Sequence, residues 1–293
     1  MPARNVQIRG LRRDIVVIGA SAGGIEALMS IIARLPHDLP AALFVVVHLS
    51  SEASSSLAQI LDRVGTLPVR TAQDKTPIEH GHIYVAPPDR YLLLTPDEMR
   101  VTPGPRENRH RPAIDPLVRS AALSFERRVV GIVLSGALND GTAGLLAIKR
   151  AGGIAMVQDP ATAAFPGMPI SAVGYVSVDW NLPLPALAGK VVELATGSGQ
   201  EREGSVTMEE IDDEQKSEMR VETEIAGLNP DTITHHPQYG NVSSYTCPDC
   251  HGLMWEIQDG PLLRFGAASA MLSRRNRCLK GRPIMSRRRS GWL

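Results

Sequence analysis

Hydrophobic and polar residues follow two rhythms along the first two thirds of the chain. Short apolar runs alternate with helix-length segments in which apolar residues recur every three to four positions. The pattern predicts strands at 14–19, 43–48, 68–71, 82–86, 90–95, 129–134 and 154–158, and helices at 24–35, 56–62, 114–125 and 143–151. Strands that alternate with helices are typical of parallel βαβ units. We therefore predict an α/β fold: a doubly wound, mostly parallel sheet with helices on both faces. We also expect 82–86 and 90–95 to form a hairpin.

The pattern changes after Leu194. Residues 201–224 hold ten acidic and three basic residues and only scattered apolar ones. This composition is typical of a flexible linker with at most a transient helix, and an acidic interaction tail is the alternative. Residues 273–293 carry eight Arg or Lys, which is more typical of a solvated, disordered tail than of a nucleic-acid arm. The predicted regions are an N-terminal tail (1–12), an α/β domain (13–195), an acidic flexible linker (196–232), a small segment (233–266) and a basic disordered tail (267–293). We expect a chain ending near Leu194 to fold and to keep its activity.

The overall composition excludes some classes of protein. The chain is 43% hydrophobic and 21% charged with a formal net charge of +0, so nothing calls for a nucleic-acid or anionic membrane partner. Three cysteines, two of them in one CxxC, fit a reducing compartment better than a disulfide framework. Residues 1–13 lack the apolar core of a signal peptide, and no apolar run approaches the ~18–20 residues of a membrane span. We expect a cytoplasmic protein without membrane insertion.

The first apolar strand ends in a glycine-rich turn, Gly19-Ala20-Ser21-Ala22-Gly23. This matches G-x-S-x-G, in which a sharp turn between strand and helix presents a serine hydroxyl. Backbone N–H groups at the following helix N-terminus can hold a developing oxyanion. The same residues also suit a phosphate-binding loop, so both interpretations are open at this point.

The second strand helps to separate them, because it ends in His48. A dinucleotide-binding fold usually has Asp or Glu at this position to hold a ribose hydroxyl. Adjacent parallel strands end side by side, which would bring His48 near Ser21, and an imidazole can remove the serine proton. A histidine that merely caps a helix or lines the sheet edge is the alternative. Beside a serine of this type we favour a nucleophile and its base.

Asp140 is the best candidate for a third group that orients the imidazole and stabilises its protonated form. It follows the strand 129–134 in a glycine-containing turn, where sites form in open α/β sheets. Its alternative role is to cap the next helix, worth ~1 kcal/mol. Asp115, at a predicted helix start, and Asp159, before a proline, are weaker candidates.

Several ordered motifs together resemble the catalytic domain of chemotaxis protein-glutamate methylesterases of the CheB type, from about Arg13 to about Leu194. The motifs are Ile18-Gly19-Ala20-Ser21-Ala22-Gly23-Gly24, Val46-Val47-His48, Tyr84-Val85-Ala86-Pro87-Pro88, Arg111-Pro112-Ala113-Ile114-Asp115, Leu134-Ser135-Gly136-Ala137-Leu138-Asn139-Asp140-Gly141 and 165–169. The resemblance implies hydrolysis of glutamate γ-methyl esters on chemoreceptors with release of methanol, deamidation of receptor glutamines, and no metal or organic cofactor. It implies the nucleophile at Ser21, the base at His48 and the acid at Asp140. Backbone N–H groups near Ala22 and Ala137 would hold the oxyanion.

The chain departs from the family pattern in two places before Leu194. Typical members carry an N-terminal receiver domain, and the residues before Asp14 are too few to contain one, so we expect a stand-alone domain without phosphorylation gating. The loop before the acid commonly reads Gly-Met-Gly, and here Leu138 replaces the second glycine. That change could alter the loop conformation or the substrate groove. Arg109 and Arg111 form a basic loop that could meet the acidic methylated helices of a receptor. The alternative, which the sequence supports equally, is a loop that is exposed and has no binding role.

The C-terminal segment resembles half of a zinc ribbon, with Cys247 and Cys250 as its CxxC. A structural zinc needs four ligands, and His251 or Cys278 are the residues that could be recruited beside this pair. We therefore predict a partial zinc-ribbon-like extension without a secure metal site. The function predicted for the whole chain is a serine hydrolase acting on chemoreceptors or related signalling proteins. The alternative is an inactive relative that serves as a binding module in a signalling complex.

Overall fold

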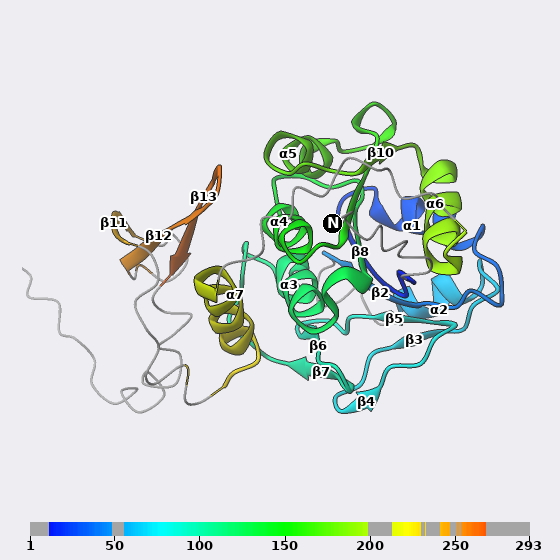
Figure 1. The fold of residues 1–293 in the computed structure, drawn as a ribbon, viewed down its shortest axis with the longest axis horizontal. Coiled ribbons are helices and arrows are strands. Elements are labelled where there is room, and N and C mark those ends of the chain that lie inside the picture. The colour runs from blue at the N-terminus through cyan, green and yellow to red at the C-terminus, as the bar shows by residue number, and fades with distance from the viewer. Residues whose placement is uncertain are drawn as a thin grey trace, which may run out of the picture.

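A seven-stranded parallel sheet forms the centre of the computed structural model, which describes residues 12–48, 56–198, 213–229, 232, 241–246, 251 and 253–267 (Figure 1). Its strands are β1 (Ile15–Ala20), β2 (Ala42–Val47), β3 (Val69–Thr71), β5 (His82–Val85), β8 (Val129–Val133), β9 (Ile154–Gln158) and β10 (Trp180–Leu182). They lie in the order β10-β9-β8-β1-β2-β5-β3, and every pairing is parallel. The predicted doubly wound α/β sheet is confirmed.

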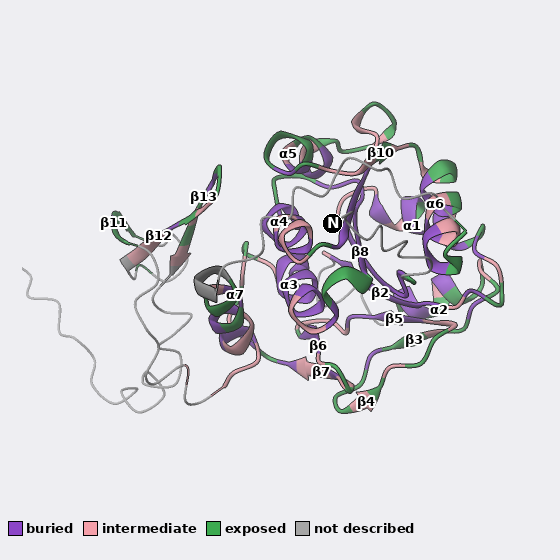
Figure 2. Ribbon diagram, viewed as in Figure 1, coloured by how far each residue is buried: buried purple, intermediate pink, exposed green. Residues whose placement is uncertain are grey.

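Helices cover both faces of this sheet. On one face lie α1 (Gly24–Ile32), α2 (Leu57–Asp62) and α6 (Leu184–Thr196), and on the other α3 (Ile114–Phe125), α4 (Thr142–Arg150) and α5 (Gly167–Tyr175), with short 3-10 turns at Glu126–Arg128 and Pro160–Thr162. Successive residues of β1 alternate between the two layers: Val16 and Ile18 pack in one apolar core, Ile15 and Val17 in the other. Because both faces are covered, β1 and β2 are buried along their whole length (Figure 2).

A second, antiparallel sheet lies beyond α3. It consists of β4 (Thr76–Pro77), β6 (Tyr91–Leu94) and β7 (Glu98–Thr102) in the order β4-β7-β6. The Leu94 N–H donates to Ser120 Oγ of α3 at 3.0 Å, which joins this sheet to the helix. The predicted hairpin of 82–86 with 90–95 is therefore wrong. β5 is a parallel strand between β2 and β3. The hairpin in this region is formed by β6 and β7, and its turn is closed where the Thr95 N–H donates to the Glu98 carbonyl at 3.0 Å.

The described part of the C-terminal region contains α7 (Asp213–Ala226) and a three-stranded antiparallel sheet of β11 (Asn241–Thr246), β12 (Leu253–Asp259) and β13 (Leu262–Ala267). Helix α7 lies inside the range predicted as a flexible linker, and it packs against α3 (Figure 1). Its buried residues include Met219, Glu222, Ile225 and Ala226, which share one helical face. The acidic composition hid this short stripe. Among the described residues, no helix combines the length and apolarity needed to cross a bilayer.

Candidate active site

The register of two central strands brings Ser21 and His48 to the same sheet edge. Ala20 of β1 pairs with Val47 of β2. Ser21 follows Ala20 and His48 follows Val47, so the two residues leave the sheet side by side. The His48 N–H donates to the Ala20 carbonyl at 3.1 Å. β1 has β2 on one side and β8 on the other, the place where the chain reverses its direction across the sheet and where open α/β sheets form their sites. Ser21 and His48 line one cleft with a volume of about 690 Å³.

Asp140 contacts the imidazole of His48 directly. The distance from His48 Nε2 to Asp140 Oδ2 is 2.6 Å, and the two side chains are only 4% and 3% exposed. Asp140 Oδ2 also accepts the Ile114 N–H at 2.7 Å, so the carboxylate lies at the N-terminus of α3. Burial would raise the pKa of Asp140, but the hydrogen bond and charge of His48, helped by Ile114 and Asn108, lower it to about 2. Asp140 is therefore ionised where it can orient and charge-stabilise the ring.

Asp140 and Asp115 share the capping of α4: Asp140 Oδ1 accepts the Gly141 N–H at 3.0 Å, and Asp115 reaches one turn further into the helix. Asp115 Oδ1 accepts the N–H groups of Gly141 at 3.0 Å and Gly144 at 2.7 Å, at the start of α4. The amide of Asn108 donates to Asp115 Oδ2 at 2.9 Å and to Asp140 Oδ1 at 2.7 Å, and so links the two carboxyls. Burial and the neighbouring charge of Asp140 raise the pKa of Asp115 well above 3.8. The third candidate acid, Asp159, caps a 3-10 turn by accepting the Ala161 N–H at 3.0 Å.

The segment before α3 contributes two residues that the sequence did not single out. Asn108 links the carboxyls, and the ring of His110 stacks on that of His48 with centroids 3.7 Å apart and planes 6° apart. Burial, followed by the charge of His48, lowers the pKa of His110, which favours a neutral His110 ring beside His48. The only signal in the sequence was a run of polar residues directly before an apolar helix.

Both arginines of the predicted basic loop line the cleft. Arg111 is held in place, because its Nε donates to Asp89 Oδ1 at 2.9 Å and its Nη1 to the Gly104 carbonyl at 2.8 Å. Arg109 is exposed and has a positive φ of 65°. Of the two, Arg109 has the side chain that is more available to a substrate.

The loop after β8 approaches the serine turn closely. The Ser21 N–H donates to the Ser135 carbonyl at 2.9 Å, and Ser135 Oγ donates to the Ala22 carbonyl at 2.8 Å. A Cβ added at Gly136 would lie 2.8 Å from the Ser21 Cβ, so only glycine fits there. Ala22 lines the cleft. Ala137, which follows Gly136, is not among the residues that line it. Leu138 has a φ of 65°, a conformation that favours the glycine it replaces in the family pattern.

Most of the candidate zinc ligands lie outside the described residues. Cys247, Cys250 and Cys278 lie outside the described residues, and His251 is exposed. Within the described ranges, no group of three or more His, Cys, Asp or Glu side chains could hold a metal ion. The partial zinc-ribbon assignment stays a prediction.

Comparison with known proteins gives one consistent family. The sequence model described as CheB methylesterase matches residues 16–191. A protein-glutamate methylesterase/protein-glutamine glutaminase of Anaeromyxobacter dehalogenans is 39% identical over 186 residues, covering 64% of this chain and 54% of that protein. A relative from Leptospira interrogans, provisionally given the same name, is 36% identical over 190 residues, covering 64% of this chain and 98% of its own.

The solved structure of the Thermotoga maritima CheB methylesterase catalytic domain has the same fold. It superposes with a TM-score of 0.60 at 34% identity, covering 62% of this chain and 98% of that one. The sheet, the serine turn and the His48–Asp140 contact all lie within or beside the matched residues. The chain thus belongs to the CheB methylesterase family of hydrolases.

Proposed function

We propose that this protein is a protein-glutamate methylesterase that acts on chemoreceptors in the cytoplasm, and that it also deamidates receptor glutamines. The observation that carries the proposal is the contact between His48 and an ionised Asp140 at the strand edge that Ser21 shares. A buried carboxylate on one imidazole nitrogen is the arrangement that turns a histidine into an effective base for a serine. The names of the family relatives supply the substrate class.

In this mechanism Ser21 is the nucleophile and His48 moves its proton. Because Nε2 of His48 faces Asp140, Nδ1 is the nitrogen left to take the proton from Ser21 Oγ. Ser21 Oγ attacks the ester carbonyl carbon, and the methoxy C–O bond breaks as protonated His48 gives its proton to the leaving oxygen. Methanol departs and leaves an acyl-serine. A water activated by His48 then hydrolyses this ester, giving the glutamate carboxylate and free Ser21.

The negative charge that develops on the carbonyl oxygen needs backbone donors. The start of α1, which follows Ala22, and the loop around Ala137 supply N–H groups on either side of the serine turn. Close approach at Gly136 supports this assignment, since it holds that loop against Ser21. For a glutamine substrate the same steps release ammonia instead of methanol.

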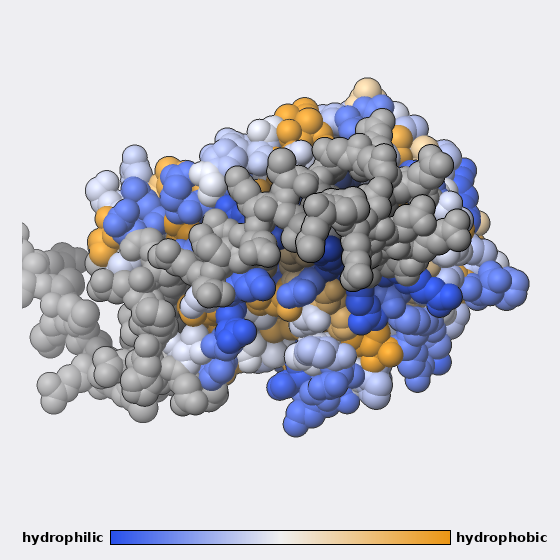
Figure 3. All heavy atoms as spheres, viewed as in Figure 1, coloured by the Kyte–Doolittle hydropathy of each residue, from blue (hydrophilic) through white to orange (hydrophobic). Residues whose placement is uncertain are grey.

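The surroundings of the cleft suit a protein surface as substrate. Three large apolar side chains are exposed: Phe165 at 49%, Leu138 at 67% and Ile170 of α5 at 56%. Phe165 lies next to Gly23 of the serine turn, and the backbone of Leu138 lies next to Gly167 at the start of α5. Figure 3 shows an apolar patch over α5. With Arg109 on the cleft, these features would fit an acidic, amphipathic receptor helix.

The proposal is tested by methanol release from methylated receptor with wild type and Ser21→Ala. We expect Ser21→Ala to lower kcat by at least about a thousandfold, leaving only catalysis by binding and oxyanion donors. A fluorophosphonate should label the wild type and not the variant. Ser30→Ala on α1, where Ser30 Oγ accepts a hydrogen bond from Arg34, is the matched control and should keep full activity. Near-wild-type turnover in folded Ser21→Ala would end the proposal. A folded wild type that neither turns over nor reacts would be the binding module instead.

A further inference from the structure

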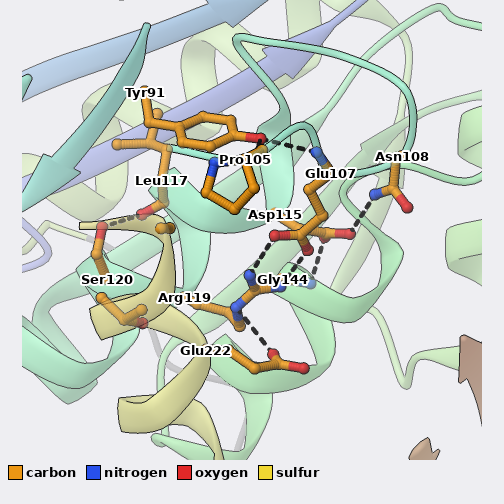
Figure 4. A network of polar contacts seen from close by, with 12 residues as sticks. Tyr91, Pro105, Glu107, Asn108, Asp115, Leu117, Arg119, Ser120, Gly144 and Glu222 are labelled. Carbon is orange, nitrogen blue, oxygen red and sulfur yellow. Dashed lines mark hydrogen bonds and ion pairs between the residues drawn. The ribbon is translucent and has the colours of Figure 1, made fainter. Parts of the chain in front are cut away.

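A fully buried arginine on α3 joins the catalytic domain to the C-terminal region. Arg119 is 2% exposed, and its Nη1 and Nη2 donate to the two carboxylate oxygens of Glu107 at 2.8 and 2.7 Å. Its Nε lies 3.1 Å from Oε2 of Glu222 on α7 (Figure 4). Helix α7 lies outside residues 16–191 matched by the family. One buried cation is thus paired with two carboxylates, one from each region.

Glu107, the first of these partners, begins the segment that contacts His48 and Asp140. The Glu107 N–H donates to the His110 carbonyl at 3.3 Å, and the His110 N–H donates to the Glu107 carbonyl at 2.8 Å. His110 stacks on His48, and Asn108 holds Asp140. A shift of Glu107 would therefore move two groups together: the His110 ring that stacks on His48, and the Asn108 amide that binds Asp140.

Helix α7 holds the start of the same segment at a second point. The Thr102 hydroxyl donates to the Ala226 carbonyl at 2.7 Å, in a buried position. A Cβ at Gly104 would lie 2.3 Å from that carbonyl oxygen. Ala226 also packs in a cluster with Tyr91, whose hydroxyl accepts the Glu107 N–H at 2.7 Å. The end of α7 and Glu222 together fix the chain between β7 and α3.

The charge of Glu222 is also shared with β13. Arg264 Nη1 lies 3.0 Å from Glu222 Oε1, and Arg264 Nη2 lies 3.1 Å from Asp259 Oδ2, which belongs to β12. Asp259 in turn pairs with Arg150 of α4. Alternating charges therefore run from the loop beside the triad through α7 to the small sheet and back to α4. In a row of desolvated charges, loss of one member leaves its neighbours buried and uncompensated.

We propose that α7 supports the active site from behind the cleft and that Glu222 is a positioning residue for His48 and Asp140, acting through Arg119 and Glu107. The kinetic part rests on the proposed methylesterase function. Without Glu222, the buried guanidinium keeps one anionic partner and must tilt toward it or toward water. The 107–110 segment then shifts, and small displacements of catalytic groups cost rate more than binding. This reverses the expectation that a chain ending near Leu194 keeps its activity.

The test uses the full chain with Glu222→Gln and the matched control Glu224→Gln, two residues along the same helix. Glu224 pairs with Thr232 of its own segment. We expect Glu222→Gln to lower kcat about tenfold with KM changed less than about twofold, and Glu224→Gln to leave both within about twofold. For a proton between His48 Nε2 and Asp140 Oδ2, which lie 2.6 Å apart, we expect a downfield signal in the proton NMR spectrum. We expect Glu222→Gln to shift or broaden it and Glu224→Gln to leave it in place.

The outcomes separate this proposal from the methylesterase assignment. If the wild type releases no methanol, the assigned function fails, while the NMR signal still tests the positioning role. If Glu222→Gln lowers the melting temperature but leaves kcat and the signal unchanged, α7 only stabilises the fold and the proposal is wrong. If Glu222→Gln does not fold, the isosteric Thr102→Val carries the same test. It removes one buried hydrogen bond to α7, and it should lower kcat about threefold and disturb the same signal. An unchanged kcat and signal in that variant would overturn the proposal as well.

Discussion

The central sheet and α7 are joined to the rest of the molecule by different kinds of contact. In the sheet, β1 and β2 are buried apolar strands on which helices pack from both sides. α7 brings a short apolar stripe with the buried Glu222 in its middle, aimed at Arg119. Apolar burial is non-directional and spread over many side chains, whereas a buried ion pair depends on a few atoms. The first kind of contact should tolerate small changes, and the second should respond sharply to single substitutions.

The largest expected effect lies at the sheet edge. Asp140→Asn removes the charge that supports protonated His48, so we expect kcat to fall about 100- to 10,000-fold with little change in KM. Asp115→Asn, at the neighbouring buried carboxyl that caps α4, is the matched control and should cost about tenfold or less. Methanol release and thermal unfolding of both variants are the measurements. A loss of stability with an unchanged rate in Asp140→Asn would make Asp140 a cap and not the acid.

A smaller effect is expected where the two regions touch. Gly104→Ala would place a Cβ 2.3 Å from the Ala226 carbonyl and 2.7 Å from the Tyr91 ring, so the end of α7 must move. We expect the free energy of unfolding to fall by about 1–3 kcal/mol, measured by urea denaturation. Gly174→Ala in α5, where a Cβ meets nothing within 4 Å, is the control and should be neutral or slightly stabilising. Equal stabilities of the two variants would mean that this contact is slack.

The smallest effect is a pH dependence specific to Glu222. Burial raises the pKa of this carboxyl, but Arg119 and Arg264 outweigh it and lower the pKa below its ordinary 4.5. The folded state then binds the proton less tightly than the unfolded chain. The stabilisation is present above pH 4.5 and is lost as the pH falls through the folded pKa. The difference in unfolding free energy between wild type and Glu222→Gln should shrink as the pH is lowered below 4.5. A difference that grows in acid would contradict this assignment.

Much of the site could be predicted because strand ends are determined locally. Ser21 and His48 each follow an apolar run, and parallel neighbours end at one edge, so their proximity followed from the pattern. The hairpin error had the opposite cause. The runs 82–86 and 90–95 look alike in sequence, and only the turn at Thr95 and the space beside β2 decide that β5 joins the large sheet and β6 the small one.

The amino-acid sequence by itself determined the doubly wound sheet, its serine turn and the residues at its edge, since hydrophobic period and turn chemistry act over short stretches of chain. Only the tertiary structure decided that Asp140 faces His48 while Asp115 reaches the first turn of α4, and that His110 stacks on His48. It also decided that an acidic segment becomes α7. The contribution of Glu222 to the structure depends on Arg119, a buried residue about a hundred positions earlier. No local sequence pattern encodes the desolvation that makes this ion pair important.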